Sequence, residues 1–272
     1  MIGALAGDII GRPYEMVNWK STQFPLFHDK CKPTDDSILT LAIADAFMNN
    51  KDIRTTLQNY FHRYPTAGYG MNFKLWAMDR HEEFLLSSGN GSAMRVSPVA
   101  YLSDDISEVL NLAKKSAEPS HSEDDGINGA KAIAGCVYGA KHGWSKDRIR
   151  EFVIKDFYNV DFKYEDLVEN YTEDGSWGYT CAKSVPYAIY CFLISNDFED
   201  CIRKSISIGG DSDTIAAMAG SIAEAYYGGV PEAILEKTLS YFKNDVYLWN
   251  IIAEFNFKFL PYKYDIQPII QK

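Results

Sequence analysis

The chain has 272 residues and a mass of 30.7 kDa, and its 37 acidic and 27 basic side chains give a formal net charge of −10 at pH 7. With 46% hydrophobic and 24% charged residues, it has the composition of a globular protein rather than a disordered one. The longest stretch without a charged side chain, residues 184–196, is shorter than the roughly 18 residues that cross a bilayer, and residues 1–11 lack the basic segment of a secretory signal.

The hydrophobic pattern predicts helices along the whole chain, and strand-type alternation is nearly absent. The predicted helices span residues 37–48, 106–117, 129–142, 146–158, 184–194, 214–227 and 231–242. The helix over 214–227 is rich in alanine and glycine, so neighbouring helices can approach it closely and we place it in the centre of the core. Because no repeat or linker divides the chain, we expect an all-α single domain over residues 1–272.

Five cysteines form an odd set without a C-x-x-C pair. We expect them to be buried and reduced, which indicates a cytoplasmic protein. The acidic balance argues against an extended nucleic-acid-binding surface, because such surfaces neutralise phosphates with clustered lysine and arginine. We also expect no membrane association and a monomer.

A group of oxygen-bearing side chains begins the predicted helix over 37–48. The sequence T-D-D-S places Thr34, Asp35, Asp36 and Ser37 in succession. A helix N-cap is the simpler interpretation of this segment taken alone, because one such residue accepts hydrogen bonds from the first free N–H groups. Four in a row exceed what capping requires.

A second group begins the alanine-rich helix, where residues 208–216 read I-G-G-D-S-D-T-I-A. Asp211 and Asp213 repel each other unless a cation lies between them. Hard divalent ions such as Mg²⁺ and Mn²⁺ prefer oxygen ligands, and both groups offer only oxygen. If the two helix starts meet, they form an oxygen cage for one or two metal ions.

Two acidic residues near the N-terminus have simpler interpretations. Asp8 lies in an apolar, glycine-rich run, where a buried aspartate usually accepts hydrogen bonds from the backbone. Glu15 follows Pro13, and its position in a turn is typical of an exposed residue.

Residues 88–98, S-G-N-G-S-A-M-R-V-S-P, form a glycine-rich loop before a predicted helix start. The free N–H groups of Gly89, Gly91 and Ser92 suit a phosphate or a sugar hydroxyl. The loop lacks the G-x-x-x-x-G-K-[ST] and G-x-G-x-x-G nucleotide fingerprints.

Three further side chains lie in predicted loops. His121 stands beside acidic residues, which is typical of a surface histidine that titrates near neutral pH. Tyr69 and Trp177 are flanked by glycines, so either ring could stack on a base, although core packing is the commoner role of aromatic residues.

Five segments in this order resemble the ADP-ribosylglycohydrolase family, which includes the dinitrogenase reductase-activating glycohydrolase. They are G-D-I-I-G-R-P-Y-E, T-D-D-S, G-N-G-S-A-M-R, S-V-P-Y-A-I-Y-C-F-L and G-G-D-S-D-T-I-A-A-M-A-G, between residue 3 and about residue 231. The resemblance implies a compact orthogonal bundle of helices with two divalent ions, Mg²⁺ or Mn²⁺, at the base of a cleft. It also implies hydrolysis of the bond between C1″ of ADP-ribose and an acceptor.

The resemblance further implies residue roles. The implied metal ligands are Thr34, Asp35, Asp36, Asp211, Asp213 and Thr214. Glu15, together with Asp36, is implied to act in catalysis. The implied substrate contacts are Gly70, Gly91, Ser92, Met94 and His121. Ser37 and Ser212 stand where many members have threonine, which leaves the metal chemistry unchanged.

One loop departs from the family pattern. Members that act on ADP-ribosyl-arginine tend to have an acidic residue in the loop matching Ala67–Lys74, which here reads A-G-Y-G-M-N-F-K. The substrate is expected to be an ADP-ribosylated protein or another ADP-ribose conjugate, and the acceptor stays open between arginine, serine, a nucleobase and a small molecule. Two other functions remain as alternatives, a two-metal nucleotide phosphohydrolase and a non-catalytic ADP-ribose-binding module.

Overall fold

The structure is a computed structural model that describes residues 1–79, 85–172, 177–260 and 264–269, so the expected domain over 1–272 includes short segments outside the described residues. The α-helices are α1 (Ile2–Gly11), α2 (Asp35–Met48), α3 (Ile53–Arg63), α4 (Met71–Asp79), α5 (Gly91–Met94), α6 (Ile106–Ala117), α7 (Asp124–Lys141), α8 (Lys146–Asp156), α9 (Tyr164–Asn170), α10 (Cys181–Leu193), α11 (Phe198–Ser207), α12 (Ser212–Tyr226), α13 (Glu232–Ser240) and α14 (Val246–Phe259). Two 3-10 helices, η1 (Glu15–Val17) and η2 (Ser97–Tyr101), complete the set.

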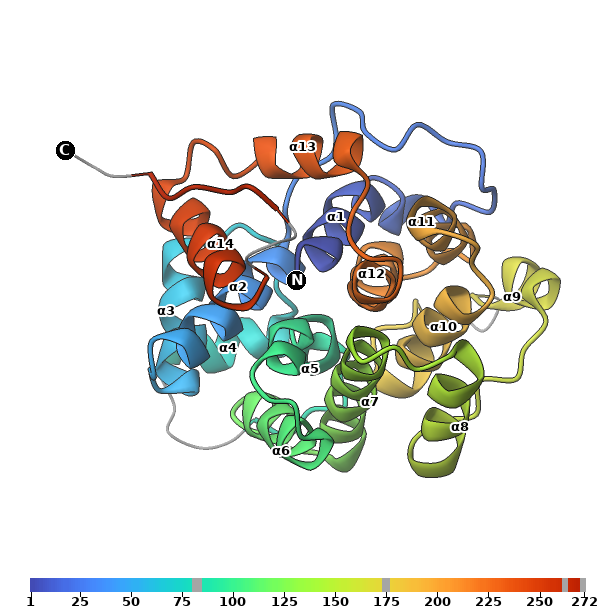
Figure 1. Cartoon of the computed structure of the whole chain (residues 1–272), viewed down its shortest axis with the longest axis horizontal. Coiled ribbons are helices and arrows are strands. Elements are labelled where there is room, and N and C mark those ends of the chain that lie inside the picture. The colour runs from blue at the N-terminus through green and yellow to red at the C-terminus, as the bar shows by residue number, and fades with distance from the viewer. Residues whose placement is uncertain (80–84, 173–176, 261–263, 270–272) are drawn as a thin grey trace.

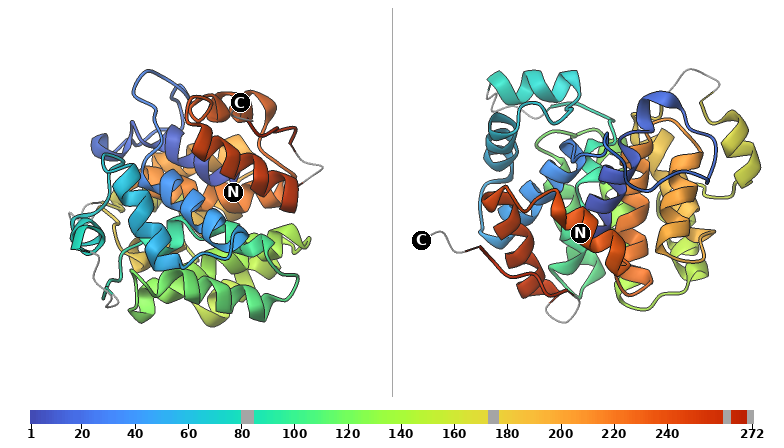
Figure 2. Two further views of the ribbon diagram at one scale, coloured as in Figure 1. Left: turned by 90° about the vertical axis from the view of Figure 1, so that its left-hand side faces the viewer. Right: turned by 90° about the horizontal axis from the view of Figure 1, so that it is seen from above.

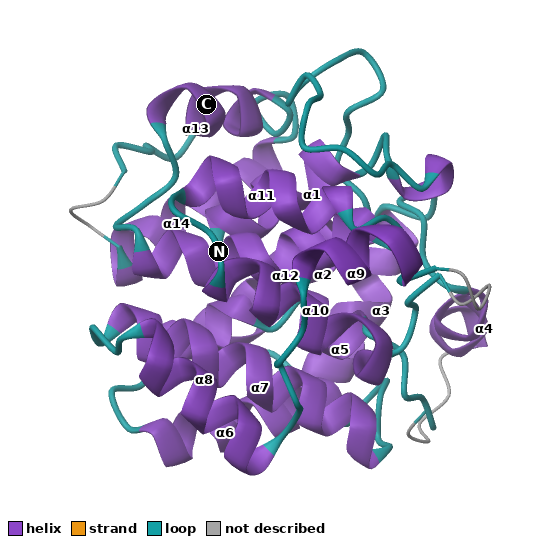
Figure 3. Ribbon diagram, turned by 90° about the vertical axis from the view of Figure 1, so that its right-hand side faces the viewer, coloured by secondary structure: helices purple, strands orange, loops and turns teal. Residues whose placement is uncertain are grey.

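The all-α class is confirmed. Within the described ranges the only β-type pairing is an isolated antiparallel bridge between Gly89 and Thr180, and Figure 3 shows helices joined by loops. Figure 2 shows the bundle from two further sides. In the same ranges, no helix combines the length and the apolar character that crossing a bilayer requires. All five cysteines are free and buried, as expected.

Helix α12 lies in the centre of the bundle and contacts α1, α7, α10 and α11 (Figure 1). Its side chains are buried from Ser212 to Ala225, as its alanine-rich sequence predicts. Helices α2, α3 and α14 lie on one side of it, and α5, α6 and α7 lie below in the view of Figure 1.

Glycines on one face of α1 make its contact with α12 unusually close. Gly3, Gly7 and Gly11 are four residues apart, so they share a helix face. A Cβ atom added at Gly7 would overlap the backbone of Ala216, and one at Gly11 would lie within 2.5 Å of the Asp213 Cα. The end of α1 therefore lies directly against the start of α12.

The starts of α2 and α12 have different local causes. Thr34 is the N-cap of α2, in an extended conformation, and its Oγ1 accepts a hydrogen bond from the Asp36 N–H at 3.3 Å. Before α12, Gly209 and Gly210 have φ values of 80° and 68°, a left-handed region that glycine adopts without strain. This turn allows the chain to enter α12 with Asp211 and Asp213 beside the end of α1.

Several predicted boundaries shift. Helix α7 begins at Asp124 rather than at residue 129, so the poor helix formers Gly126 and Gly129 lie within its first turns. Both are required by packing, because a Cβ atom at Gly126 would lie 2.8 Å from the Ser87 carbonyl oxygen and one at Gly129 would overlap the Cys181 sulfur. Helix α10 begins at Cys181 rather than at residue 184 and contains Pro186.

Candidate active site

A cleft of about 520 Å³ lies where α2 and α12 begin. All but one of the residues with implied site roles line it, namely Glu15, Thr34, Asp35, Asp36, Gly70, Gly91, Met94, His121, Asp211, Asp213 and Thr214. Cavities of about 770 Å³ and 950 Å³ lie against α14, and neither contains these residues. The two oxygen-rich helix starts therefore meet in one cleft.

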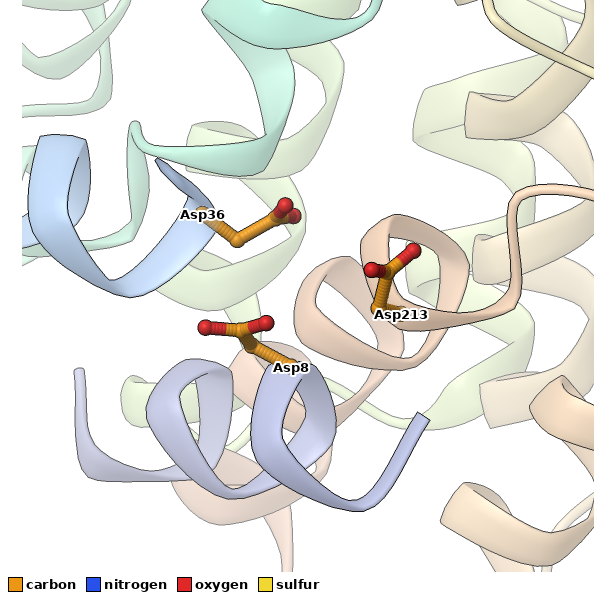
Figure 4. A group of neighbouring side chains, drawn as sticks. All are labelled: Asp8, Asp36 and Asp213. Atoms are coloured by element: carbon orange, nitrogen blue, oxygen red, sulfur yellow. The ribbon is translucent and has the colours of Figure 1, made fainter. Parts of the chain in front are cut away.

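Two groups of carboxylates lie close enough to share a cation. The ligand oxygens of Asp8, Asp36 and Asp213 lie within 4.8 Å of one another, and so do those of Glu15, Asp211 and Asp213. Figure 4 shows that Asp8, Asp36 and Asp213 come from three different helices and face a common space. Asp213 belongs to both groups, so the groups are adjacent.

Asp8 is largely satisfied by protein donors. Its carboxylate accepts hydrogen bonds from the N–H and the Oγ1–H of Thr34, at 2.9 and 2.7 Å, and from the N–H and the hydroxyl of Ser37. The expectation that Asp8 is buried and accepts backbone hydrogen bonds is confirmed. Because these donors belong to the first turn of α2, Asp8 ties α1 to the start of α2.

The other aspartates are far less satisfied. Asp36 Oδ1 is buried and has no hydrogen-bond partner among the described residues. Burial raises the pKa of Asp35 to about 8 and that of Asp211 to about 7, with further contributions from neighbouring carboxylates. Burial and adjacent carboxylates also raise the pKa of Asp36 and of Asp213.

This donor set fits hard divalent cations. It consists of carboxylate and hydroxyl oxygens, which Mg²⁺ and Mn²⁺ prefer, and it contains no soft sulfur ligand. A bound cation lowers the pKa of adjacent carboxylates, which would offset the mutual repulsion of these side chains. The site therefore has acidic groups that could bind metal ions.

Glu15 lies in η1, at the edge of this acidic cluster. Its side chain is 18% exposed and forms an ion pair with Arg12, so the expectation of an exposed turn residue is wrong. Burial raises the pKa of Glu15, and the Arg12 guanidinium offsets part of that effect. The turn at Pro13 faces into the cleft because the end of α1 lies against α12.

Asn90 is a site residue that its isolated position in the sequence did not reveal. Its side-chain N–H groups donate to Asp211 Oδ2 at 2.6 Å and to the Gly178 carbonyl at 3.2 Å, so it holds the Asp211 carboxylate. The available signal was its place in G-N-G-S-A-M-R, between two glycines of the cleft loop.

The glycine-rich loop becomes helix α5, and its residues differ in where they point. Gly91 and Met94 line the cleft. The Ser92 side chain does not: it is buried and its hydroxyl donates to the Gly126 carbonyl at 2.7 Å, because α5 packs on α7. A substrate contact by Ser92 could therefore involve only its backbone.

The remaining loop residues divide in the same way. Gly70 lines the cleft, and a Cβ atom there would meet open space. Tyr69 is 2% exposed and stacks on Phe73 with ring centroids 5.4 Å apart, so it is a core residue and not a platform for a base. Trp177 is half-buried, and its carbonyl accepts a hydrogen bond from the Asp211 N–H at 2.8 Å. A stacking role for Trp177 stays a prediction.

His121 is buried, with 6% exposure, and lines the cleft, so the expectation of a surface histidine is wrong. Burial and the positive charge of Arg95 lower its pKa well below the ordinary value. The acidic neighbours in the sequence suggested a surface loop, whereas the chain turns inward here before α7. Arg95 also lines the cleft, and sequence reasoning gave it no role.

The chain is similar to known proteins in sequence and in fold. A family model described as ADP-ribosylglycohydrolase matches residues 1–254. A mouse (Mus musculus) protein named ADP-ribosylhydrolase ARH3 is 27% identical over 325 aligned positions, which cover 90% of this chain and 88% of the mouse protein. The Escherichia coli K12 protein YegU, named as uncharacterized, is 25% identical over 84% of this chain and 86% of its own length. A solved structure named ADP-ribosylglycohydrolase-related protein complex has a TM-score of 0.64 at 21% identity, covering 88% of this chain and 94% of that chain, and this likeness concerns the fold alone.

Proposed function

We propose that this chain, which belongs to the ADP-ribosylglycohydrolase family and is thus a glycosyl hydrolase of ADP-ribosyl groups, is metal-dependent. The proposed reaction cleaves the bond at C1″ and releases ADP-ribose from a side chain, nucleobase or small acceptor. The observation that carries this proposal is the convergence of two acidic helix starts, distant in sequence, on one cleft.

The proposed cofactor is a pair of Mg²⁺ or Mn²⁺ ions. The residues that would hold them are Thr34, Asp35, Asp36, Asp211, Asp213 and Thr214. When bound, such ions supply Lewis-acid and charge-neutralising chemistry that orients sugar hydroxyls and lowers the pKa of water. Two observations support this assignment. Asp36 Oδ1 is buried without a hydrogen-bond partner among the described residues, and the cleft carboxylates have raised pKa values.

Glu15 is the proposed general acid or base. Its raised pKa, caused by burial, brings it nearer to the range in which a carboxyl group can exchange a proton at neutral pH. Its ion pair with Arg12 holds the carboxylate at the edge of the cluster, within reach of a proton on an attacking water or on the departing acceptor. Glycoside hydrolysis passes through an oxocarbenium-like state.

The cleft loop is proposed to bind the rest of ADP-ribose. The backbone N–H groups of Gly91 and Ser92 suit the diphosphate, which is how an acidic protein can hold an anion. Met94 and His121 both lie near Gly91 in the cleft lining, and a Cβ atom at Gly70, which also lines the cleft, would meet open space. The absence of a carboxylate in residues 67–74 weakens arginine as the acceptor without selecting another.

Product analysis tests the reaction class. The protein is incubated with serine-, arginine- and nucleobase-linked ADP-ribose and with O-acetyl-ADP-ribose, with Mg²⁺ or Mn²⁺, and products are identified by mass. Intact ADP-ribose is the expected product. Release of phosphate or a nucleoside monophosphate would indicate a two-metal phosphohydrolase instead, and binding without turnover would indicate a binding module.

The role of Glu15 is tested by Glu15→Gln. Metal affinity should be preserved, because the proposed ligands are unchanged, whereas kcat should fall by about 10²- to 10⁴-fold, the usual contribution of a general acid or base. Glu199→Gln is the matched control, since it also breaks a Glu–Arg ion pair but lies on α11, outside the cleft. Full kcat in Glu15→Gln at saturating metal would exclude this role.

A further inference from the structure

Three side chains form a hydrogen-bonded chain that leads to the cleft. Arg95 is fully buried, and its NH2 group donates to the Ser116 carbonyl at 2.8 Å and to Ser120 Oγ at 2.7 Å. Ser120 Oγ lies in turn 2.9 Å from His121 Nδ1. The hydrogen bonds therefore connect a buried cation, through one hydroxyl, to a histidine of the cleft.

The direction of each proton in this chain follows from the donors available. A guanidinium can only donate, so Ser120 Oγ accepts from Arg95. The Ser120 hydroxyl is fully buried and has no other hydrogen-bond acceptor among the described residues, so its own proton goes to His121 Nδ1. Nδ1 is then an acceptor, and the ring proton of the neutral imidazole must sit on Nε2.

The opposite side of the histidine ring faces the glycine-rich loop. A Cβ atom at Gly91 would lie 3.0 Å from His121 Nε2, and one at Gly89 would lie 3.3 Å from it, so both glycines leave room for the ring edge. His121 lines the cleft, and within the described part of the chain Nε2 makes no hydrogen bond. The Nε2–H group is therefore available to a ligand that occupies the cleft.

We propose that Arg95 and Ser120 are positioning residues that fix His121 in its neutral Nε2–H tautomer, so that His121 presents one hydrogen-bond donor to an oxygen of the bound ligand. That the ligand is an ADP-ribosyl group rests on the proposed function. The fixing of the His121 tautomer does not rest on the proposed function, because the tautomer is a property of the free protein.

The charge of Arg95 favours the same state. Burial lowers the pKa of Arg95 to about 9, so it remains a cation at neutral pH, and the Nε and NH1 groups of Arg95 have no hydrogen-bond partner among the described residues. A second positive charge on His121 would be close to this uncompensated cation. Burial and this repulsion lower the pKa of His121, which keeps the ring neutral.

The tautomer is measured by ¹⁵N NMR of the histidine rings in the free protein at pH 7, and the His121 signals are assigned as those lost in His121→Asn. We expect a pyridine-type nitrogen at Nδ1 and a pyrrole-type nitrogen at Nε2. The opposite pattern, or an imidazolium with two protonated nitrogens, would overturn the proposal.

Ser120→Ala tests the contribution of the hydroxyl. It should mix the His121 tautomers and weaken binding of free ADP-ribose by roughly 2- to 10-fold, the range that corresponds to one hydrogen bond. Ser116→Ala is the matched control, because among the described residues that buried hydroxyl bonds only to the Ala113 carbonyl, while the Ser116 carbonyl keeps its contact with Arg95. It should leave both the tautomer and the ADP-ribose affinity unchanged.

The results distinguish a failure of the positioning role of Ser120 from a failure of the proposed function. An unchanged tautomer in Ser120→Ala, or equal loss of ADP-ribose affinity in both variants, would overturn the positioning role. If Ser120→Ala does not fold, the wild-type spectrum still decides the tautomer. If the wild-type protein has the expected tautomer but neither binds ADP-ribose nor hydrolyses its conjugates, the proposed function fails while the positioning of His121 stands.

Discussion

Helix α2 carries a buried aspartate near each end, and the two are held very differently. Near the C-terminal end, Asp45 accepts hydrogen bonds from Asn49, Lys51, Tyr60 and Tyr247, at 2.8 to 3.1 Å. Burial alone would raise its pKa, but these bonds hold the pKa below the ordinary value. At the N-terminal end, Asp36 has a raised pKa and an oxygen with no partner among the described residues.

This contrast distinguishes a structural carboxylate from one that could bind a cation. The protein supplies four donors to Asp45, one of them a lysine, and leaves Asp36 among other carboxylates. The Thr34 hydroxyl lies 3.1 Å from Asp36 Oδ2 but also donates to Asp8, and an ionised carboxylate with so few donors is costly in a buried site. The cleft therefore has uncompensated negative charge that divalent cations would neutralise. At the far end of the same helix, the negative charge of Asp45 is already compensated by protein donors.

The largest expected effect separates the two aspartates. Asp36→Ala should abolish metal uptake and lower turnover by at least about 10³-fold, the order of effect seen when a transition-state stabiliser is removed. Asp45→Asn should leave kcat and metal affinity within a few-fold but reduce the free energy of unfolding by about 2 kcal/mol, because hydrogen bonds to a buried charge are lost. Isothermal calorimetry with Mn²⁺, steady-state kinetics and urea unfolding measure these quantities.

The reverse results would contradict the proposed difference between Asp36 and Asp45. If Asp36→Ala bound Mn²⁺ as tightly as the wild-type protein, Asp36 would not be a ligand. If Asp45→Asn lost metal binding at a temperature where it is folded, the two ends of α2 would not be functionally distinct.

Removing a hydrogen-bond donor to a cleft carboxylate should have a smaller effect on metal affinity than removing the carboxylate itself. Asn90→Ala removes the amide that holds Asp211, and loss of such an outer partner typically weakens metal affinity by about 10- to 100-fold. Asn49→Ala is the matched control, since it removes an equivalent 2.8 Å amide bond to Asp45 and should leave metal affinity unchanged. Equal metal affinities in the two variants would show that Asn90 does not act through Asp211.

The smallest effect concerns pH and stability. The pKa values of about 8 for Asp35 and about 7 for Asp211 exceed those of carboxyl groups in an unfolded chain, near 4. The unfolded chain therefore binds fewer protons than the native state, and metal-free protein should lose stability as pH rises through 7 to 8. Each kcal/mol lost lowers the Tm by roughly 2–4 °C.

Differential scanning calorimetry in EDTA between pH 5.5 and 8.5 tests this sign. The Tm of the metal-free protein should fall over the range, and added Mg²⁺ should raise it most at the alkaline end, because the ligands must be deprotonated to bind. Asp45→Asn should show the same slope, since the depressed pKa of Asp45 affects stability only in acid. A metal-free Tm that rises with pH would contradict the raised pKa values.

Much of the fold follows from local sequence patterns. The four oxygen-bearing residues from Thr34 to Ser37 and the run from Gly209 to Thr214 are local signals of helix starts, and the structure has helices there. The alanine and glycine content of residues 214–227 likewise predicts close packing around α12. The segment after α1 was harder to predict, because the turn after Pro13 gives no sign that Glu15, at the start of η1, lines the cleft.

The rest of the site depends on contacts that no single segment encodes. Asn90 matters because Asp211 lies beside it, 121 residues away in the sequence. Ser92 points into α7 and Tyr69 into the core because of what packs against them. His121 is buried and contacts Ser120, whereas its acidic neighbours in the sequence suggested a surface residue.

The most direct test of the account is a crystal of the protein soaked in Mn²⁺, with anomalous diffraction measured at the manganese edge. We expect anomalous density in the space between the carboxylates at the start of α2 and those at the start of α12, with Asp36 and Asp213 among the ligands. An empty cleft under millimolar Mn²⁺, or helix starts whose carboxylates point apart, would contradict the central claim.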